Sequence, residues 1–485
     1  MRISGFGLYA LSCAAVAMLA GCNSSSAVPQ PLTAAKPIQH VVIMMQENRS
    51  FNTIFAGFPG AVTALVGKCE PVHISGQKLC QTGMTKLTPV PLKTGVYGSR
   101  DIGHSHKVFE IECNLDSSGI CRNDGFDKIG FGENGSGEPA GLYPYSYVYR
   151  SETKAYWDFA KQYALADHMF FTQTAASFIA HQIILTGTVA LNSDESLTDQ
   201  PNGMPWGCDA SPGTHPPLLK TNGKEFLHGP FPCFTEYGTM ADLLDPANVS
   251  WKYYVDPYQG KDRDFSGGVW NGFDAIAKVR CKTWTPPYKK RPGDCDGYGP
   301  DWAHISFPNT SVFSDIKGGK LPAVSWVIPT LADSDHPASS CNGGPRWVSS
   351  VVNAIGESKY WNSTAVIVLW DDWGGWYDPV PPPQTNYTSL GFRVGTIVIS
   401  PWARPNTVLH TQYEFGSILK FIEQNFGLGS LHTTDETSTS IGDMFNYSQK
   451  PTKFVSEPLP HASKCASQPA ASIQEIIEHD GGVPE

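Results

Sequence analysis

The sequence predicts an α/β protein with a mostly parallel central sheet. Two observations predict this class: short, almost wholly apolar runs with β-branched residues recur along the chain, and segments with the apolar spacing of helices lie between them. Continuous apolar runs of this length are typical of strands that are buried on both faces, as in parallel sheets. Strands that alternate with helices indicate the α/β class.

The predicted strands are four such runs, at residues 40–45, 323–328, 365–370 and 396–400. The predicted helices are three segments in which apolar residues recur three and four positions apart, at 156–163, 348–355 and 415–426. Such stripes are typical of helix faces that pack on a core. Residues 201–308 differ, because they are dense in Gly, Pro, Trp and Cys and show little periodicity. We therefore predict an irregular insertion or cap over the sheet in this segment.

The first residues have the pattern of an export signal. Arg2 precedes an apolar run at 10–19, which is shorter than the roughly 20 residues that cross a bilayer. The run leads to Leu-Ala-Gly-Cys22, which resembles a lipobox, so we predict a lipoprotein signal peptide at 1–21 and a tether at 22–36. The alternative is an ordinary secretion signal with a chance cysteine. By resemblance to Gram-negative lipoproteins, the lack of Asp after Cys22 indicates the outer membrane of the cell envelope.

The cysteine count supports export. Of the 12 cysteines, Cys13 lies in the predicted signal and Cys22 is the predicted lipid attachment site, which leaves 12 − 2 = 10, an even number. Pairing of near neighbours gives Cys69/Cys80, Cys113/Cys121, Cys208/Cys233 and Cys281/Cys295, which leaves Cys341 and Cys465 as the last pair. This connectivity is an interpretation, because sequence alone does not fix pairing. The chain contains no C-x-x-C pair, so disulfides in an oxidising compartment account for the cysteines better than zinc or thioredoxin chemistry does.

Length and charge limit the functional classes. The predicted mature chain has 485 − 21 = 464 residues, which is ample for one large core or two domains. We expect one main domain at 37–460 and a C-terminal tail at 461–485. The formal net charge is 35 − 45 = −10, which argues against nucleic-acid binding because that function needs a basic surface.

Acidic side chains follow two of the predicted strands. The first strand leads into Glu47 and Asn48, and the third leads into Asp371 and Asp372. Ligands of open α/β sheets gather beyond the carboxyl ends of the strands. Carboxylates at such a place are costly unless they are paired or metal-bound, and three of them with an amide oxygen suit a divalent cation. The alternative is that Glu47 and Asp372 are solvated turn residues.

These segments together resemble the bacterial phosphoesterase family that includes phospholipases C and respiratory-burst-inhibiting acid phosphatases. ENRSF at 47–51 is similar to the family's opening signature, and DDWGGWYDPVPPP at 371–383 resembles its second signature. Further stretches continue the resemblance in the same order, at 324–329, at 399–402, and at Asp435 with 443–445. The resemblance spans about 37–451. It implies an alkaline-phosphatase-like α/β/α sandwich and a metal-dependent hydrolase of phosphate esters.

The resemblance also implies a Ser or Thr nucleophile beside the metal. Ser177, with His181 four residues on, resembles the phosphatase pattern PS-x-x-GH, although Ala176 and Ala180 replace its Pro and Gly. The phospholipase pattern PT-x-PNR is absent. Ser177 is therefore the expected nucleophile for a phosphomonoesterase of the acid phosphatase type.

The mechanism that follows uses one divalent metal ion, whose identity the sequence leaves open. Its expected ligands are Glu47, Asn48, Ser177, Asp371 and Asp372. The ion activates the hydroxyl of Ser177 for attack on phosphorus, which gives a phosphoserine that water then hydrolyses. Thr172 and Thr174 lie nearby and are alternative nucleophiles.

Three histidines are candidates to contact the phosphate oxygens, where negative charge spreads in the transition state. They are His104, His304 and His336. His104 and His336 are preferred, because their neighbours resemble the family, and His106 is an alternative to His104. Protonated imidazoles favour an acidic working pH, in keeping with an acid phosphatase.

Three positions depart from the family pattern. Asn52 stands in place of the last residue of ENRSFD, and Pro379 and Phe415 stand in place of histidines. The carboxylates remain, so metal binding is expected to remain as well. The lost histidines leave the phosphate contacts and the range of substrates open.

Two further hypotheses stand beside the acid phosphatase. A phospholipase C would share the metal and nucleophile but should present an apolar face to lipid, and Trp206, Trp251 and Trp270 keep this alternative open. A catalytically degenerate surface lipoprotein that only binds is the third, supported by the missing histidines. The expected partners are a phosphate-ester substrate and a membrane reached through the lipid at Cys22.

Overall fold

The structure is a computed structural model that describes residues 37–71, 80, 82–92, 101–132, 134–261, 263–283, 297–337, 343–384 and 388–460. The chain divides into two units, Met1–Lys36 and Pro37–Glu485, and all described residues belong to the second. The predicted signal peptide, tether and C-terminal tail lie outside the described residues. In the part of the chain that is described, no helix has both the length and the apolar character needed to cross a bilayer.

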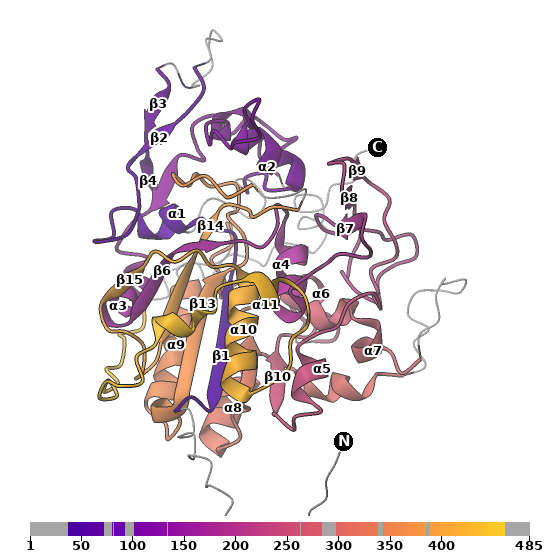
Figure 1. The fold of residues 1–485 in the computed structure, drawn as a ribbon, viewed down its shortest axis with the longest axis vertical. Coiled ribbons are helices and arrows are strands. Elements are labelled where there is room, and N and C mark those ends of the chain that lie inside the picture. Colours follow the sequence, from indigo (N-terminus) through magenta and orange to yellow (C-terminus); the bar gives the residue numbers. More distant parts are fainter. Residues whose placement is uncertain are drawn as a thin grey trace, which may run out of the picture. The chain divides into compact units, whose positions relative to one another are not determined.

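An eight-stranded sheet forms the centre of the second unit (Figure 1). In spatial order its strands are β11 (Ile305–Ser306), β10 (Trp251–Tyr254), β12 (Val324–Val327), β1 (His40–Gln46), β13 (Thr364–Trp370), β14 (Arg393–Ile399), β6 (Ala164–Phe170) and β15 (Thr407–Leu409). Every neighbouring pair is parallel except the two that involve β14, which runs antiparallel to both β13 and β6. The prediction of an α/β fold with a mostly parallel sheet is therefore confirmed.

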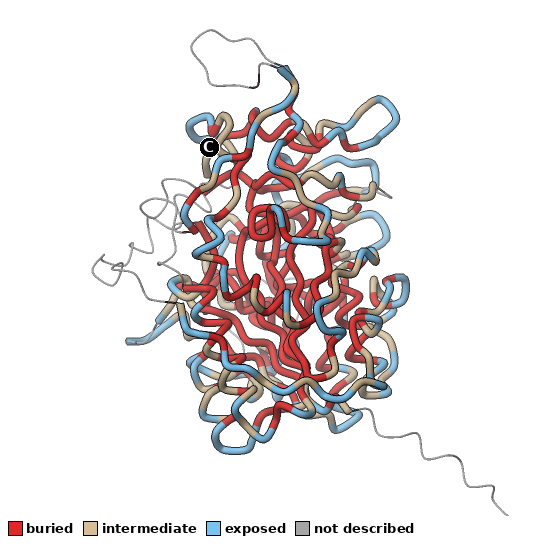
Figure 2. The backbone as a smooth tube through the Cα atoms, turned by 90° about the vertical axis from the view of Figure 1, so that its left-hand side faces the viewer, coloured by how far each residue is buried: buried red, intermediate tan, exposed pale blue. Residues whose placement is uncertain are grey.

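Helices cover both faces of this sheet. The longer ones are α2 (His106–Cys113), α3 (Lys154–Gln162), α4 (Ser177–Thr186), α8 (Ser311–Gly318), α9 (Gly343–Gly356) and α10 (Phe415–Phe426), with the short α1 (Phe51–Phe55) and α11 (Thr434–Thr437). Helix α9 contacts α3 and α8 in one group, and α10 contacts α4 and α11 in a second group. Strand β13 is buried at every residue, as expected for a sheet covered on both sides (Figure 2).

Residues 201–308 do more than cap the sheet. They contribute β10 and β11, which pair in parallel beyond β12. They also hold α5 (Ala241–Leu244), α6 (Ser266–Val269), α7 (Ala277–Arg280) and the strands β8 (Leu218–Lys220) and β9 (Glu225–Phe226), which form a small separate sheet with β7 (Glu195–Leu197). The description of this segment as an insertion or cap therefore fits only part of it. Strand β10, with the sequence WKYY, is short and aromatic, so it lacks the β-branched signal that marked the other strands.

The tryptophans of this segment lie in the core. Trp206 is 7% exposed, and Trp251 and Trp270 are each 1% exposed. None of these three rings is available to contact a lipid surface. The apolar face that an aromatic-rich cap would offer to lipid is therefore not formed by these residues.

Four small strands lie outside the two sheets described so far. Strand β2 (Val66–Lys68) pairs antiparallel with β3 (Met84–Lys86), and β4 (Thr88–Val90) pairs in parallel with β5 (Ser146–Val148). In Figure 1, β2, β3 and β4 lie at the top, above the carboxyl ends of the central strands. They belong to the long connection between β1 and β6.

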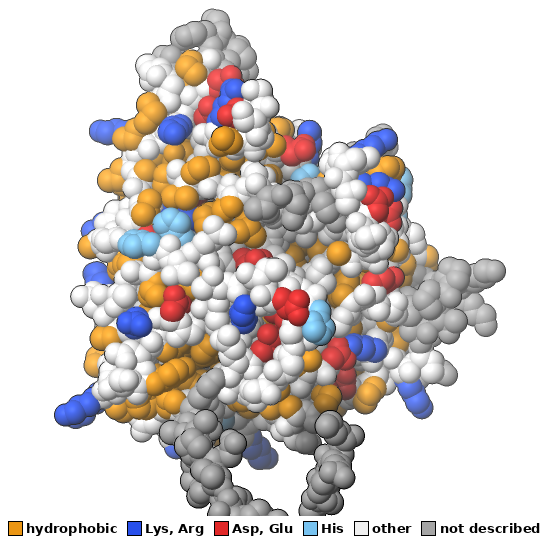
Figure 3. Space-filling model, viewed as in Figure 1, with side chains coloured by type: hydrophobic (Ala, Val, Ile, Leu, Met, Phe, Trp, Pro, Cys, Tyr) orange, Lys and Arg blue, Asp and Glu red, His pale blue; other side chains and the backbone are white. Residues whose placement is uncertain are grey.

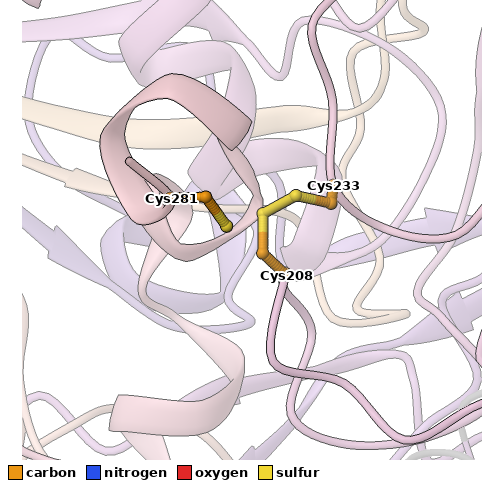
Figure 4. Close-up of side chains that lie close together, drawn as sticks. All are labelled: Cys208, Cys233 and Cys281. Carbon is orange, nitrogen blue, oxygen red and sulfur yellow. A yellow bond between two sulfur atoms is a disulfide. The ribbon is translucent and has the colours of Figure 1, made fainter. Parts of the chain in front are cut away.

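Three of the predicted disulfides are present. They join Cys69 to Cys80, Cys113 to Cys121, and Cys208 to Cys233. Cys281 is also disulfide-bonded and lies next to the Cys208–Cys233 bond (Figure 4), but its predicted partner Cys295 is outside the described residues. The pair Cys341/Cys465 lies outside them as well. Because their sulfurs are oxidised, Cys208, Cys233 and Cys281 form no thiolate metal site despite their proximity.

A carboxyl pair between α10 and α11 makes stability depend on pH. Burial raises the pKa of Glu423 to about 8, and the negative charge of Asp435 adds to this. The folded protein thus holds a proton that the unfolded chain releases near its ordinary pKa of 4.5. We expect the free energy of unfolding to fall as the pH rises between these values, and Glu423→Gln to reduce that slope. Urea titrations across this range measure it, and an unchanged slope in Glu423→Gln, with Glu436→Gln as the control, would contradict the assignment.

Candidate active site

The predicted metal-binding residues meet at the carboxyl edge of the sheet. Glu47 and Asn48 follow β1, and Asp371 and Asp372 follow β13, which is the direct neighbour of β1. Strand β6, parallel to both of them, leads through a short loop to Ser177 at the first position of α4. The side chains after β1 and β13 are completely buried, and Ser177 is 5% exposed. Three strand ends thus supply one compact polar cluster.

Backbone hydrogen bonds lock the two strand ends together. The Asn48 N–H donates to Asp371 Oδ1 at 2.7 Å, and the Arg49 N–H donates to the Asp372 carbonyl at 3.1 Å. Asn48 has a φ of 51°, a left-handed conformation that Asn tolerates better than most residues. Gly374 packs so closely that an added Cβ would lie 2.4 Å from the Asn48 carbonyl oxygen. The geometry of both acidic loops is therefore fixed by the local backbone.

The Ser177 hydroxyl lies against this cluster. Its Oγ lies 3.3 Å from Asn48 Oδ1 and 3.3 Å from Asp372 Oδ2. Helix α4 begins at Ser177, and its N-cap residue Ala176 makes no side-chain cap. The N–H groups at the start of a helix favour a negatively charged ligand. The hydroxyl of Ser177 is thus placed between oxygen ligands and an anion-favouring helix end.

His181 joins the cluster from the next turn of α4. Its Nε2 lies 3.0 Å from Glu47 Oε1, and its ring stacks near Trp270 with 6.2 Å between ring centroids. Burial lowers the pKa of His181 to about 4, so the imidazole is neutral near pH 7 and able to act as a metal ligand. His181 was not among the predicted metal ligands, although its position four residues after Ser177 places both on one face of the helix.

The donor set fits a divalent cation. One ligand atom each from Glu47, His181 and Asp371 lie within 4.8 Å of one another. Asp371 Oδ2 is buried and has no hydrogen-bond partner among the described residues. Burial and the charge of Asp371 raise the pKa of Asp372 well above its ordinary value, so the carboxylates repel one another in the absence of a cation. Buried oxygens of this kind are stabilised by a bound metal ion.

Of the candidate histidines, His104 and His336 border this cluster. His104 Nε2 lies 3.1 Å from Asn48 Nδ2, while its Nδ1 lies 2.7 Å from the Ile102 carbonyl oxygen. The ring of His336 lies 6.2 Å from that of Trp270, which also stacks on His181. His104 thus contacts the cluster directly through Asn48, whereas His336 reaches it through the ring of Trp270.

The other two histidines point elsewhere. His106 Nδ1 lies 2.8 Å from Thr174 Oγ1, so His104 rather than His106 faces Asn48. His304 lies at the opposite end of the sheet, where its Nδ1 lies 3.0 Å from the carbonyl oxygen of Trp251, the first residue of β10. The structure does not bring His304 to the cluster. The prediction that His304 contacts phosphate is therefore wrong.

Comparison with known proteins shows which family this chain belongs to. Residues 38–429 match the Phosphoesterase family. The chain belongs to that family. The phosphoesterase is 27% identical to "Phospholipase C B" of Mycobacterium tuberculosis (strain ATCC 25618 / H37Rv) over 469 residues, which cover 85% of this chain and 78% of the relative. It is 24% identical to "Hemolytic phospholipase C" of Pseudomonas aeruginosa over 449 residues, which cover 84% of this chain and 55% of the relative.

A solved protein of the alkaline phosphatase superfamily from Vibrio parahaemolyticus aligns with the phosphoesterase at a TM-score of 0.30 and 14% identity, over 57% of this chain and 60% of that one. The family match and the phospholipase relatives together make this protein a hydrolase of phosphoric esters. The predicted family and enzyme class are thus confirmed.

Two of the three departures from the family pattern, Asn52 and Phe415, lie beside the site rather than in it. The Asn52 side chain donates to the Ala64 carbonyl at 3.1 Å and accepts from the Ala64 N–H at 2.8 Å, so it holds a loop. Phe415 is buried and packs on Phe171 with 5.6 Å between ring centroids. Neither of these side chains contacts Ser177 or the carboxylates in any hydrogen bond of the described structure.

Loss of one buried carboxylate should weaken metal binding by the phosphoesterase. We expect Asp371→Asn to raise the dissociation constant for a divalent cation by at least about tenfold, because the substitution neutralises a buried carboxylate whose Oδ2 has no hydrogen-bond partner among the described residues. Isothermal titration calorimetry on chelator-treated protein measures the constant. Asp116→Asn, at an exposed position, is the matched control. An unchanged affinity in Asp371→Asn would exclude this residue as a ligand.

Proposed function

We propose that this phosphoesterase cleaves its substrate with Ser177 as the nucleophile, through a phosphoserine intermediate. The observation that carries the proposal is the position of Ser177 Oγ, 3.3 Å from both Asn48 Oδ1 and Asp372 Oδ2 at the start of α4. The Ser177 oxygen attacks phosphorus as the bond from phosphorus to the leaving oxygen breaks. Water then releases phosphate or a phosphate ester and restores the hydroxyl.

A metal ion belongs to this proposal. Its ligands would be Glu47, Asn48, Ser177, Asp371 and Asp372, the set expected from the sequence, and His181 is an additional candidate. A bound divalent cation would supply positive charge that lowers the pKa of a hydroxyl and offsets charge in the transition state. The chain's own residues hold the serine in place: Asn48 and Asp372 orient Oγ, and the first turn of α4 faces the phosphoryl oxygens.

His104 and His336 act on the phosphoryl group in this scheme. When its ring is doubly protonated, each imidazole donates from Nε2 to a non-bridging oxygen, while its Nδ1–H donates at 2.7 Å to the carbonyl oxygen of Ile102 (His104) or Pro337 (His336). Those contacts hold the ring orientation through the reaction. Fixed donors of this kind stabilise charge that develops in the transition state.

The preferred substrate class is the phosphodiester of a phospholipid head group, as in a phospholipase C. Support comes from the relatives, which carry that name and match about five-sixths of the chain. A second candidate, the acid phosphatase type acting on monoesters, is favoured by Ser177 and His181, whose spacing resembles the phosphatase pattern. Anchoring in the cell envelope through lipid on Cys22 stays part of the proposal, since it would hold the enzyme at a membrane surface.

Turnover of p-nitrophenyl phosphorylcholine and of p-nitrophenyl phosphate, measured side by side from pH 4 to 9 with divalent cation supplied, tests the substrate class. Preference for the choline diester supports the phospholipase C type, and preference for the monoester overturns it in favour of the phosphatase. Acid quenching during turnover, followed by mass spectrometry, should find a phosphoryl group on the Ser177 peptide. No turnover of either ester, with metal bound, would favour a protein that only binds.

A further inference from the structure

A second cluster of metal-ligating side chains lies away from the active site, at the β15 edge of the sheet. Asp167 and His168 are consecutive residues of β6, and His410 follows directly after β15. One ligand atom from each of the three residues lies within 4.8 Å of the others. In the view of Figure 3, histidine side chains gather on the surface over β6 and β15.

The backbone explains how consecutive strand residues reach one point. Successive side chains of a regular strand point to opposite faces. Between the pairs Ala166↔Thr396 and Met169↔Val394, however, β6 has two residues where β14 has only Gly395. This is a β-bulge, which turns the side chain of an extra residue toward the face of its neighbour. The bulge therefore brings Asp167 and His168 to the same side.

The register of β15 supplies the third side chain. Leu409 is the partner of Ala166 in the parallel pair, so the next residue, His410, lies beside Asp167. His410 Nδ1 lies 2.9 Å from both carboxylate oxygens of Asp167, and His168 Nδ1 lies 2.6 Å from Oδ1. The Val62 N–H donates to Oδ2 at 2.8 Å and fixes the carboxylate plane.

The carboxylate of this cluster is buried, whereas its imidazoles reach solvent, as a metal site with an entry path requires. The Asp167 side chain is completely buried, whereas those of His168 and His410 are 23% and 56% exposed. Solvent thus reaches the two imidazoles, so an ion has an entry path and room for a water ligand. Small rotations of both imidazole side chains would widen their nitrogen-to-oxygen distances, now 2.6 and 2.9 Å, to the roughly 3.3 Å found around a tetrahedral zinc ion with bonds of about 2.0 Å.

We propose that Asp167, His168 and His410 bind a divalent transition-metal ion of the zinc type, at a site separate from the catalytic cluster. Two imidazoles and one carboxylate with an open position suit Zn²⁺ better than Ca²⁺ or Mg²⁺, which prefer all-oxygen sites. The ion ties β6 to the segment after β15 and, through Val62, to the loop after α1. It therefore stabilises the strand that leads to Ser177 without entering the reaction.

Zinc titration calorimetry on the full chain, stripped with chelator, tests the site. We expect two classes of binding site in the wild type, loss of one class in His410→Ala, and loss of the other in Glu47→Gln. His432→Ala, which removes a more exposed histidine that also pairs with a carboxylate, is the matched control and should keep both classes. The exposure of His410 makes its removal compatible with folding.

The electronic spectrum of bound Co²⁺ gives a second readout. In Glu47→Gln, which is expected to have lost metal binding at the active-site cluster, Co²⁺ should still produce visible bands of a low-coordinate nitrogen and oxygen site, and His168→Ala in that background should abolish them. Zinc should also raise the melting temperature of Glu47→Gln but not of the variant that additionally carries His410→Ala. Equal zinc stoichiometry and affinity in His410→Ala, His168→Ala and His432→Ala would overturn the proposal, and the three side chains would then be an ion-paired contact only.

Discussion

Replacement of Ser177 by alanine should abolish ester hydrolysis while leaving the fold intact. The Oγ atom is the nucleophile of the proposed mechanism, so its loss should lower kcat by at least about a thousandfold. Ser177 is the first residue of α4 and makes no cap, so the substitution deletes one oxygen from a site and no helix contact. Steady-state turnover of the preferred p-nitrophenyl ester measures the effect, and circular dichroism confirms the fold.

Two neighbouring threonines provide matched controls for Ser177→Ala. The Thr172 hydroxyl accepts a hydrogen bond from the Phe415 N–H at 2.8 Å, and the Thr174 hydroxyl lies 2.8 Å from His106 Nδ1. Both hydroxyls are thus engaged away from Asn48 and Asp372. We expect Thr172→Val and Thr174→Val to retain turnover within about tenfold of wild type. Full activity in Ser177→Ala together with an inactive Thr174→Val would move the nucleophile to Thr174.

Much of the sheet was predictable because its inner strands bury both faces. Strands β1, β12, β13 and β14 all coincide with apolar runs in the sequence. Strand β6 did not stand out, since its sequence ALADHMF places Asp and His in the middle. Its polar residues lie at the bulge, where tertiary contacts satisfy them. Local hydrophobicity does not encode that arrangement.

The part of the candidate site that lies directly after predicted strands could be predicted from the sequence. Glu47 and Asp371 follow strong strand signals, so their meeting at one edge of the sheet could be derived from the sequence. His304 could not be excluded in the same way, because its position depends on β10, whose short aromatic sequence gave no strand signal. His181 could have been predicted to lie at the site, since its spacing of four residues from Ser177 places both on one helix face.

A second polar network, centred on Arg393, stabilises the sheet beneath the site. The Arg393 side chain is completely buried in β14, and its guanidinium pairs with both carboxylate oxygens of Asp378 at 2.8 and 3.1 Å. It also donates to the carbonyl oxygens of Asp167 at 2.6 Å and Val62 at 3.0 Å. Asp378 in turn accepts a hydrogen bond from the Asn52 N–H at 3.1 Å. The loop that carries Asp378 follows directly after Asp371 and Asp372.

Arg393→Met should therefore destabilise the protein by about 3–5 kcal/mol, because it leaves the buried carboxylate of Asp378 without its cation and two carbonyl oxygens without donors. Guanidinium chloride unfolding at neutral pH measures the change. The double variant Arg393→Met/Asp378→Asn should recover part of the loss, since it also removes the uncompensated charge. Arg404→Met, at an exposed arginine, should cost no more than about 0.5 kcal/mol. A small effect of Arg393→Met, or no recovery in the double variant, would mean that water reaches Asp378 and that the pair contributes little.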